Sequence, residues 1–185
     1  MSMDLAELER LSRQVRVAVF DVDGVLTDGS ILLGPDGEEY KQFNVRDGQG
    51  MTMLREAGIE LAVITGRQSS VVAHRMTELG VRFVYQGRRD KLEALDQLCE
   101  EAGVAADRLS YLGDDLPDIP VMRRVGLPIA VADAHPAVFG VACCRTSAPG
   151  GRGAAREVAE FLVHACGRLP FPCTPLVPLN CPAPR

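Results

Sequence analysis

Short segments of almost purely apolar residues recur along the chain and alternate with longer segments of mixed polarity. Five apolar segments rich in β-branched and aromatic residues predict buried strands: residues 15–20, 59–64, 81–85, 109–112 and 127–131. Four intervening segments have helical periodicity: residues 48–57, 69–79, 91–102 and 115–124. Repeated strand–helix–strand units predict an α/β fold, a doubly wound parallel sheet of Rossmann-like type with helices on both faces. Ligands of such folds bind at the carboxyl ends of the strands.

Two segments depart from this alternation. Strand-like residues 30–33 and 39–43 flank the turn sequence GPDG at 34–37, which predicts a small β-hairpin inserted after the first strand. Residues 169–185 are rich in proline, at a density that excludes a regular helix or a central strand. We therefore expect one domain over residues 1–168, followed by an extended proline-rich tail over residues 169–185.

Acidic residues follow the first and fourth predicted strands. Asp21 and Asp23 lie two residues apart on extended backbone, so their side chains face one site. Repulsion between two such carboxylates is relieved by a hard cation bound through oxygen. Asp114, Asp115 and Asp118 form a second acidic group after the fourth strand. Each group alone is also typical of a solvent-exposed turn or of an acidic helix cap.

Residues suited to hold a phosphate follow the second and third predicted strands. Thr65 and Gly66 place a hydroxyl and a flexible amide before a helix N-terminus. Lys91 opens the next helix, where its positive charge opposes the helix dipole and favours a bound anion. An ordinary helix cap and a surface lysine are the plain alternatives. We prefer one shared site, because all these groups stand where parallel sheets bind their ligands.

The amino-acid composition argues against two classes of binding partner, nucleic acids and membranes. The chain has a formal net charge of -5, no Trp and 5% aromatic residues. These values argue against a nucleic-acid partner, because phosphate backbones attract basic surfaces and bases stack on aromatic side chains. No apolar run approaches the roughly 18 residues that span a membrane, so no membrane partner is expected. The charged N-terminal segment lacks the apolar core of an export signal, and the six cysteines lack CxxC spacing. We expect a cytoplasmic protein with reduced thiols.

The ordered set Asp21-x-Asp23, Thr65, Lys91 and Asp114-Asp115 resembles the haloacid-dehalogenase superfamily of phosphatases. Within it, the chain resembles the 3-deoxy-D-manno-octulosonate 8-phosphate phosphatase family, a capless subclass. The resemblance is carried by DVDGVLTDG (21–29), FNVRDG (43–48), ITGR (64–67), YQG (85–87), GDDL (113–116), AVADAHP (130–136) and GGRGA (150–154). These segments span nearly the whole chain before the tail, which itself departs from the family pattern.

The resemblance implies a Mg²⁺-dependent phosphatase with a haloacid-dehalogenase type of fold, acting on an acidic sugar phosphate such as 3-deoxy-D-manno-octulosonate 8-phosphate. It implies that Asp21 takes the phosphoryl group and that Asp23 serves as general acid and then general base. Mg²⁺ is expected at Asp21, Asp114 and the backbone carbonyl of Asp23, with Asp115 in the outer shell.

Further roles follow from the same resemblance. The phosphoryl oxygens are expected to be bound by Thr65, Gly66 and Lys91. Asp118 is expected to orient these groups. An acidic sugar also needs a cation for its carboxylate, and three arginines are candidates for that role: Arg46, Arg67 and Arg88.

The intervals on either side of Thr65 are too short for a full cap domain. The resemblance implies that such members close their sites by assembly, so we expect a homotetramer. A phosphatase for a nine-carbon sialic-type acid 9-phosphate is an alternative. A response-regulator receiver is disfavoured, because its accepting aspartate follows the third strand. A catalytically silent assembly domain is a further alternative, against which the complete catalytic set argues.

Overall fold

A seven-stranded sheet forms the centre of the computed structural model, which describes residues 3–179. Its strand order is β5-β4-β1-β6-β7-β8-β9, and every pairing is parallel except that of β8 with β9. The strands are β1 (Val17–Phe20), β4 (Glu60–Ile64), β5 (Phe83–Tyr85), β6 (Leu109–Gly113), β7 (Leu127–Ala130), β8 (Cys144–Arg145) and β9 (Val177–Pro178). The five predicted strands are confirmed, and β8 adds a sixth strand to the parallel part of the sheet.

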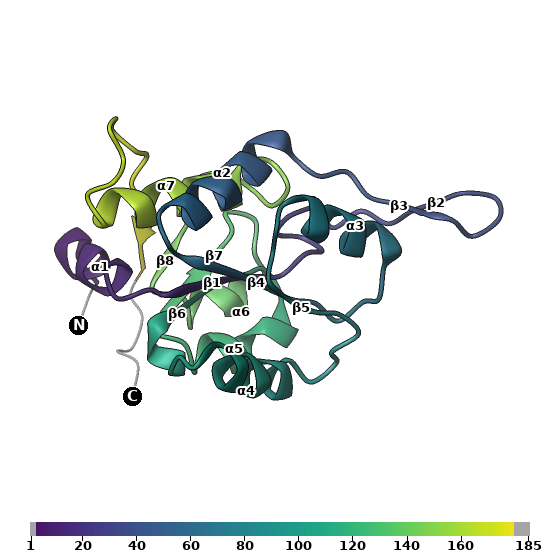
Figure 1. Ribbon diagram of the computed structural model, residues 1–185, viewed down its shortest axis with the longest axis horizontal. Helices are drawn as coiled ribbons and strands as arrows, with labels where there is room; N and C mark the ends of the chain where they lie inside the picture. The colour runs from purple at the N-terminus through teal and green to yellow at the C-terminus, as the bar shows by residue number, and fades with distance from the viewer. Residues whose placement is uncertain (1–2, 180–185) are drawn as a thin grey trace.

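Helices cover both faces of the sheet, as predicted. In Figure 1, α2, α3 and α7 lie on one face, and α4 and α5 lie on the other. The helices are α1 (Leu5–Ser12), α2 (Val45–Glu56), α3 (Ser70–Glu78), α4 (Lys91–Ala102), α5 (Ile119–Met122), α6 (Pro136–Phe139) and α7 (Ala154–Ala165). Burial on both faces explains the continuous apolar character of β1, whose four residues are all buried.

The helix expected over residues 115–124 is wrong, because this segment is not one continuous α-helix. A 3₁₀ turn (Leu116–Asp118) is followed by the four-residue helix α5. Pro117 and Pro120 provide no backbone N–H groups, so a continuous ladder of α-helical hydrogen bonds cannot form through this segment. Helix α2 begins three residues earlier than expected, because the Asn44 side chain caps it by accepting from the Arg46 amide at 2.8 Å.

The fold contains elements that were not predicted. Helices α1 and α7 pack together, and α7 also packs against α2. Strands β8 and β9 extend the sheet beyond β7. Strand β9 comes from the proline-rich segment, and Leu176 beside it is 1% exposed. Residues 169–179 therefore contribute an edge strand to the sheet, whereas the tail beyond 179 lies outside the described residues.

The predicted hairpin is present as a separate two-stranded sheet, β2 (Leu32–Leu33) and β3 (Glu39–Tyr40). It projects away from the body of the molecule at the right of Figure 1. Its apolar side chains are exposed, among them Leu32 at 64% and Leu33 at 60%. Within residues 3–179, no helix is both long and apolar enough to cross a bilayer.

Candidate active site

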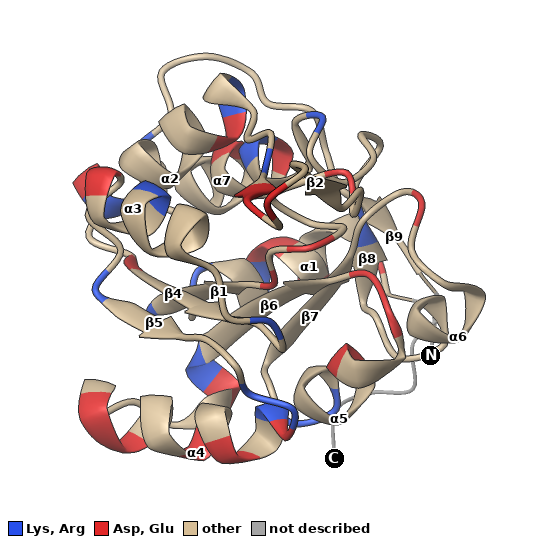
Figure 2. Ribbon diagram, turned by 90° about the vertical axis from the view of Figure 1, so that its right-hand side faces the viewer, with Lys and Arg blue, Asp and Glu red and all other residues tan. Residues whose placement is uncertain are grey.

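Parallel pairing brings the loops after β1 and β6 together at the carboxyl edge of the sheet. Phe20 and Leu112 are register partners, and the Asp21 amide donates to the Leu112 carbonyl at 3.1 Å. Asp21 and Asp114 therefore leave adjacent strands side by side. Figure 2 shows acidic stretches on the loops at this edge.

A buried lysine links Asp21 with Asp118. Lys91, 5% exposed, places its Nζ 2.8 Å from Asp21 Oδ2 and 2.7 Å from Asp118 Oδ1. Burial acts to lower the pKa of Lys91, but the attraction of the two carboxylates outweighs it and the pKa is raised. The lysine is therefore a cation at neutral pH, fixed between two anions at the first residue of α4.

Asp118 holds this part of the site together. Its Oδ1 accepts from the Tyr111 hydroxyl at 2.6 Å, and its Oδ2 accepts from the amides of Asp114 at 2.9 Å and Asp115 at 3.2 Å. The carboxylate thus orients Lys91 and fixes the loop after β6. Its hydrogen bonds agree with the orienting role expected for Asp118.

Asp114 presents an oxygen without a partner. Its Oδ1 is buried and has no hydrogen-bond partner in the described part of the chain. Burial first, and then repulsion by Asp21 and Asp118, raise the pKa of Asp114 to about 8. The pKa of Asp21 is raised as well, because burial outweighs the attraction of Lys91. The positive charge of Lys91 alone therefore does not offset the burial and mutual repulsion of these carboxyl groups.

These carboxylates fit a divalent cation. Oxygens of Asp21, Asp114 and Asp118 lie within 4.8 Å of one another. Ionised together, these three carboxylates would exceed the single positive charge of Lys91 by two, an excess that a divalent cation would balance, and all-oxygen sites favour Mg²⁺. Gly24 packs against this group of carboxylates, because a Cβ there would lie 2.1 Å from Asp114 Oδ2.

Two of the predicted metal-binding residues are placed differently from these three. Asp115 is exposed beyond the cluster, and the Asp23 side chain turns toward the hairpin. There it contacts Lys41 Nζ and lies 3.7 Å from Arg67 Nε. Inner-shell binding through the Asp23 carbonyl and outer-shell binding through Asp115 stay predictions.

Two of the predicted phosphate-binding residues, Thr65 and Gly66, lie on the loop after β4. Thr65 is 2% exposed, its amide donates to the Tyr85 carbonyl at 2.9 Å, and its carbonyl accepts from the Arg88 amide at 3.0 Å. These bonds join the loop after β4 to the loop after β5, next to β1. Gly66 is exposed on the first loop.

The three candidate arginines differ in their surroundings. Arg67 donates to Glu39 at 2.9 Å, and Arg88 donates to Gln97 at 3.0 Å. Arg46 is exposed in the first turn of α2. A fourth arginine, Arg75, was not singled out in the sequence.

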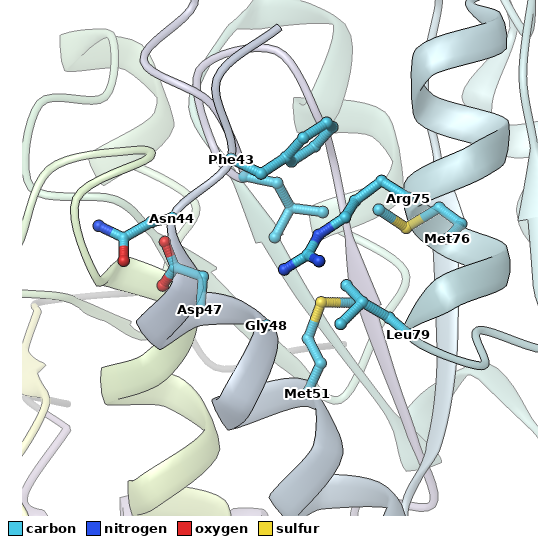
Figure 3. A pocket seen from close by; sticks show the side chains of 9 residues that line it. Phe43, Asn44, Asp47, Gly48, Met51, Arg75, Met76 and Leu79 are labelled. Atoms are coloured by element: carbon cyan, nitrogen blue, oxygen red, sulfur yellow. The ribbon is translucent and has the colours of Figure 1, made fainter.

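Arg75 lies in a narrow pocket between α2 and α3. Figure 3 shows its guanidinium pointing toward Gly48 and Met51. Its Nε is buried without a hydrogen-bond partner among the described residues. A Cβ at Gly48 would lie 2.3 Å from Arg75 Nη2, so a larger residue there would displace the guanidinium from this position.

Comparison with known proteins gives one consistent result. Residues 82–155 match the model of the haloacid dehalogenase-like hydrolases. The 3-deoxy-D-manno-octulosonate 8-phosphate phosphatase of Escherichia coli is 46% identical over 164 residues, which cover 89% of this chain and 87% of that protein.

Solved structures agree. The Yersinia pestis 3-deoxy-D-manno-octulosonate 8-phosphate phosphatase superimposes with a TM-score of 0.87 at 41% identity, covering 94% of this chain and 91% of that one. The Moraxella catarrhalis enzyme, solved with magnesium, phosphate and KDO, has a TM-score of 0.87 at 38% identity, covering 89% and 94%. This chain belongs to the 3-deoxy-D-manno-octulosonate 8-phosphate phosphatase family of haloacid dehalogenase-like hydrolases.

Proposed function

We propose that this chain removes phosphate from 3-deoxy-D-manno-octulosonate 8-phosphate in a Mg²⁺-dependent reaction. The observation that carries the proposal is the group of Asp21, Asp114 and Asp118 around Lys91, in which burial and mutual repulsion raise the pKa of Asp21 and of Asp114, and in which one carboxylate oxygen has no partner among the described residues. Family membership indicates the substrate, because the Escherichia coli and Yersinia pestis relatives are named for this activity.

Asp21 is the nucleophile of the proposed reaction. One of its carboxylate oxygens attacks phosphorus, the bond from phosphorus to the sugar oxygen breaks, and Asp23 donates a proton to that oxygen. Asp23 then takes a proton from water, whose oxygen attacks the aspartyl phosphate. Phosphate leaves and the Asp21 carboxylate is restored.

The remaining residues bind and orient. Lys91, Thr65 and the Gly66 amide hold phosphoryl oxygens as negative charge develops on them. Asp21, Asp114 and the Asp23 carbonyl would hold Mg²⁺, with Asp115 in its outer shell. When bound, this ion neutralises charge so that a carboxylate and a phosphate can approach each other. Asp118 fixes Lys91 through the 2.7 Å contact.

Arg46, Arg67 and Arg88 are the proposed partners of the sugar carboxylate. Arg88 is partly buried beside the Thr65 loop, and this position favours it. Arg67 would first have to leave Glu39, with which it pairs at 2.9 Å.

The proposal includes a homotetramer in the cytoplasm. The exposed apolar hairpin supports assembly, because covering it requires another surface. The cytoplasmic location stays a prediction from the sequence, and cell fractionation with an antibody against the chain tests it.

Phosphate release from a panel of sugar-acid phosphates tests the activity. We expect turnover of 3-deoxy-D-manno-octulosonate 8-phosphate that EDTA abolishes and Mg²⁺ restores. A nine-carbon sialic-type acid 9-phosphate is the discriminating competitor. Preference for the competitor would replace the proposed substrate, and the absence of turnover on every member would support a silent assembly domain.

A further inference from the structure

Lysine is nearly absent from this chain, and both lysines lie at the site. Of the 20 lysines and arginines, only Lys41 and Lys91 are lysines. Their side chains are 1% and 4% exposed. Each contacts an aspartate of the sequence D-x-D: Lys91 binds Asp21, and Lys41 binds Asp23. Every other position of this set is arginine, so the compact ammonium group is used only at these two buried positions.

The Lys41 side chain is buried at the base of a hairpin whose apolar side chains are exposed. A buried ammonium is stable only when anions surround it. Here the anions are Asp23, in direct contact, and Glu39, whose Oε1 lies 3.4 Å from Nζ. Arg67 contacts the same two carboxylates, at 3.7 Å and 2.9 Å. Two cations and two anions therefore alternate, with Lys41 as the buried cation and Arg67 46% exposed.

We propose that Lys41 is a positioning residue that fixes the Asp23 carboxylate for proton transfer and makes this orientation depend on the seating of the hairpin. Lys41 and Glu39 belong to the second arm of the hairpin, whereas Asp23 follows β1. The contact therefore spans the two structural units. The proposal rests on the proposed function, in which Asp23 is the acid and base.

Asp23 needs such a support. It lies on the loop after β1, where its side chain is 21% exposed, so the backbone alone leaves its rotamer open. A misplacement of about 1 Å can reduce the rate about 100-fold. Lys41 contacts one oxygen of Asp23, and Arg67 lies near the other, which leaves few orientations for the carboxylate.

The test compares two substrates in one set of variants. Lys41→Met keeps the apolar stem and removes the charge. We expect kcat for the sugar phosphate to fall about 100-fold, because a poor leaving group needs the proton. We expect kcat for p-nitrophenyl phosphate to change less than about 3-fold, because its leaving group needs no proton. Lys41→Arg, which keeps the charge, should recover at least about 10-fold of the loss.

Two controls test whether the effect is specific to Lys41 and whether it acts through Asp23. Arg82→Gln removes a positive charge from an exposed side chain just before β5 and should leave both rates unchanged. In an Asp23→Asn background, adding Lys41→Met should cause no further loss on the sugar phosphate, because the two residues act as one unit.

The outcomes separate the inference from the proposed function. Absence of Mg²⁺-dependent turnover in the wild-type protein overturns both. If Asp23→Asn affects the two substrates equally, the acid role fails, and the role of Lys41 fails with it. If those two results are as expected, two outcomes overturn the Lys41 inference alone. One is an equal loss of kcat on both substrates in Lys41→Met. The other is an additive loss of kcat in the double variant.

Discussion

Asp21 is the residue on which the proposed chemistry depends most directly. Asp21→Asn keeps the size of the side chain and leaves Lys91 paired with Asp118, so the variant should fold. It should lose at least about 10⁴-fold in kcat, the scale of removing a covalent nucleophile. Hydrolysis of p-nitrophenyl phosphate is the measurement, with circular dichroism to verify folding. A variant that hydrolyses this substrate at the wild-type rate would contradict the mechanism.

The raised pKa values of Asp114, about 8, and of Asp21 predict how pH acts on the metal-free protein. A carboxyl group with a raised folded-state pKa keeps a proton that the unfolded chain releases above about pH 4. Stability of the metal-free protein should therefore fall as pH rises from about 4 to about 8 and then level off.

Mg²⁺ should replace those protons. Binding at about pH 6.5 should release protons, so the heat of binding should depend on the ionisation enthalpy of the buffer. At about pH 9.5 this dependence should disappear, because the carboxylates are already ionised. Titration calorimetry in two buffers at each pH makes the measurement. Equal heats in both buffers at the lower pH would show that the carboxylates are ionised without the metal.

The site residues that could be predicted from the sequence are those marked by a pattern in the residues next to them. Asp21 and Asp114 close apolar strands, so topology alone places them together. Lys41 could not be found in the same way, because its contact with Asp23 joins segments that are 18 residues apart in the sequence. The scarcity of lysine was a usable signal, since both lysines stand among the groups of the site.

At the scale of elements, Asp47 in α2 caps the helix α7. Gly153, the N-cap of α7, has no side chain with which to do so. The buried Asp47 carboxylate accepts from the amides of Gly153 at 3.2 Å and Arg156 at 2.9 Å. Asp47→Ala should lower the free energy of unfolding by about 1–3 kcal/mol, because it removes a cap and leaves buried donors unsatisfied. Asp47→Asn, which keeps one acceptor oxygen, should lose less.

Urea unfolding of both variants measures this effect. The midpoints should decrease in the order wild type, Asp47→Asn and Asp47→Ala, with similar slopes. Equal midpoints for all three proteins would mean that water satisfies the α7 amides as well as Asp47 does.

The five strands that lie in apolar segments and the hairpin around the GPDG turn could be predicted from the sequence, whereas two other short strands could not. Strands β8 and β9 have two residues each, too few to show any periodicity. Helix α7 did carry a signal, because Ala155, Val158, Ala159 and Leu162 share one helix face and are buried. The helix expected over residues 115–124 was wrong because Pro117 and Pro120 interrupt the hydrogen-bond ladder of a continuous α-helix.

At the scale of the whole molecule, the hairpin is the feature that a single copy leaves unexplained. Ile31, Leu32 and Leu33 are 55%, 64% and 60% exposed, and Tyr40 on the facing strand is 52% exposed. An isolated two-stranded hairpin is marginally stable in water and has unpaired edges. The site at its base has no cap within residues 3–179. A closed symmetric assembly would cover the hairpin and shield the site from water.

Replacing Ile31 and Leu33 by Asp should therefore dissociate the assembly without unfolding the domain, because the hairpin lies outside the core. Turnover of the sugar phosphate should fall more than that of p-nitrophenyl phosphate, since a neighbouring copy would enclose the sugar. Leu5→Asp, at an exposed apolar position on α1, is the matched control and should stay assembled. Sedimentation equilibrium measures the mass, and a tetramer is expected for the wild type. A wild-type protein that is monomeric and fully active at micromolar concentration would exclude completion of the site by assembly.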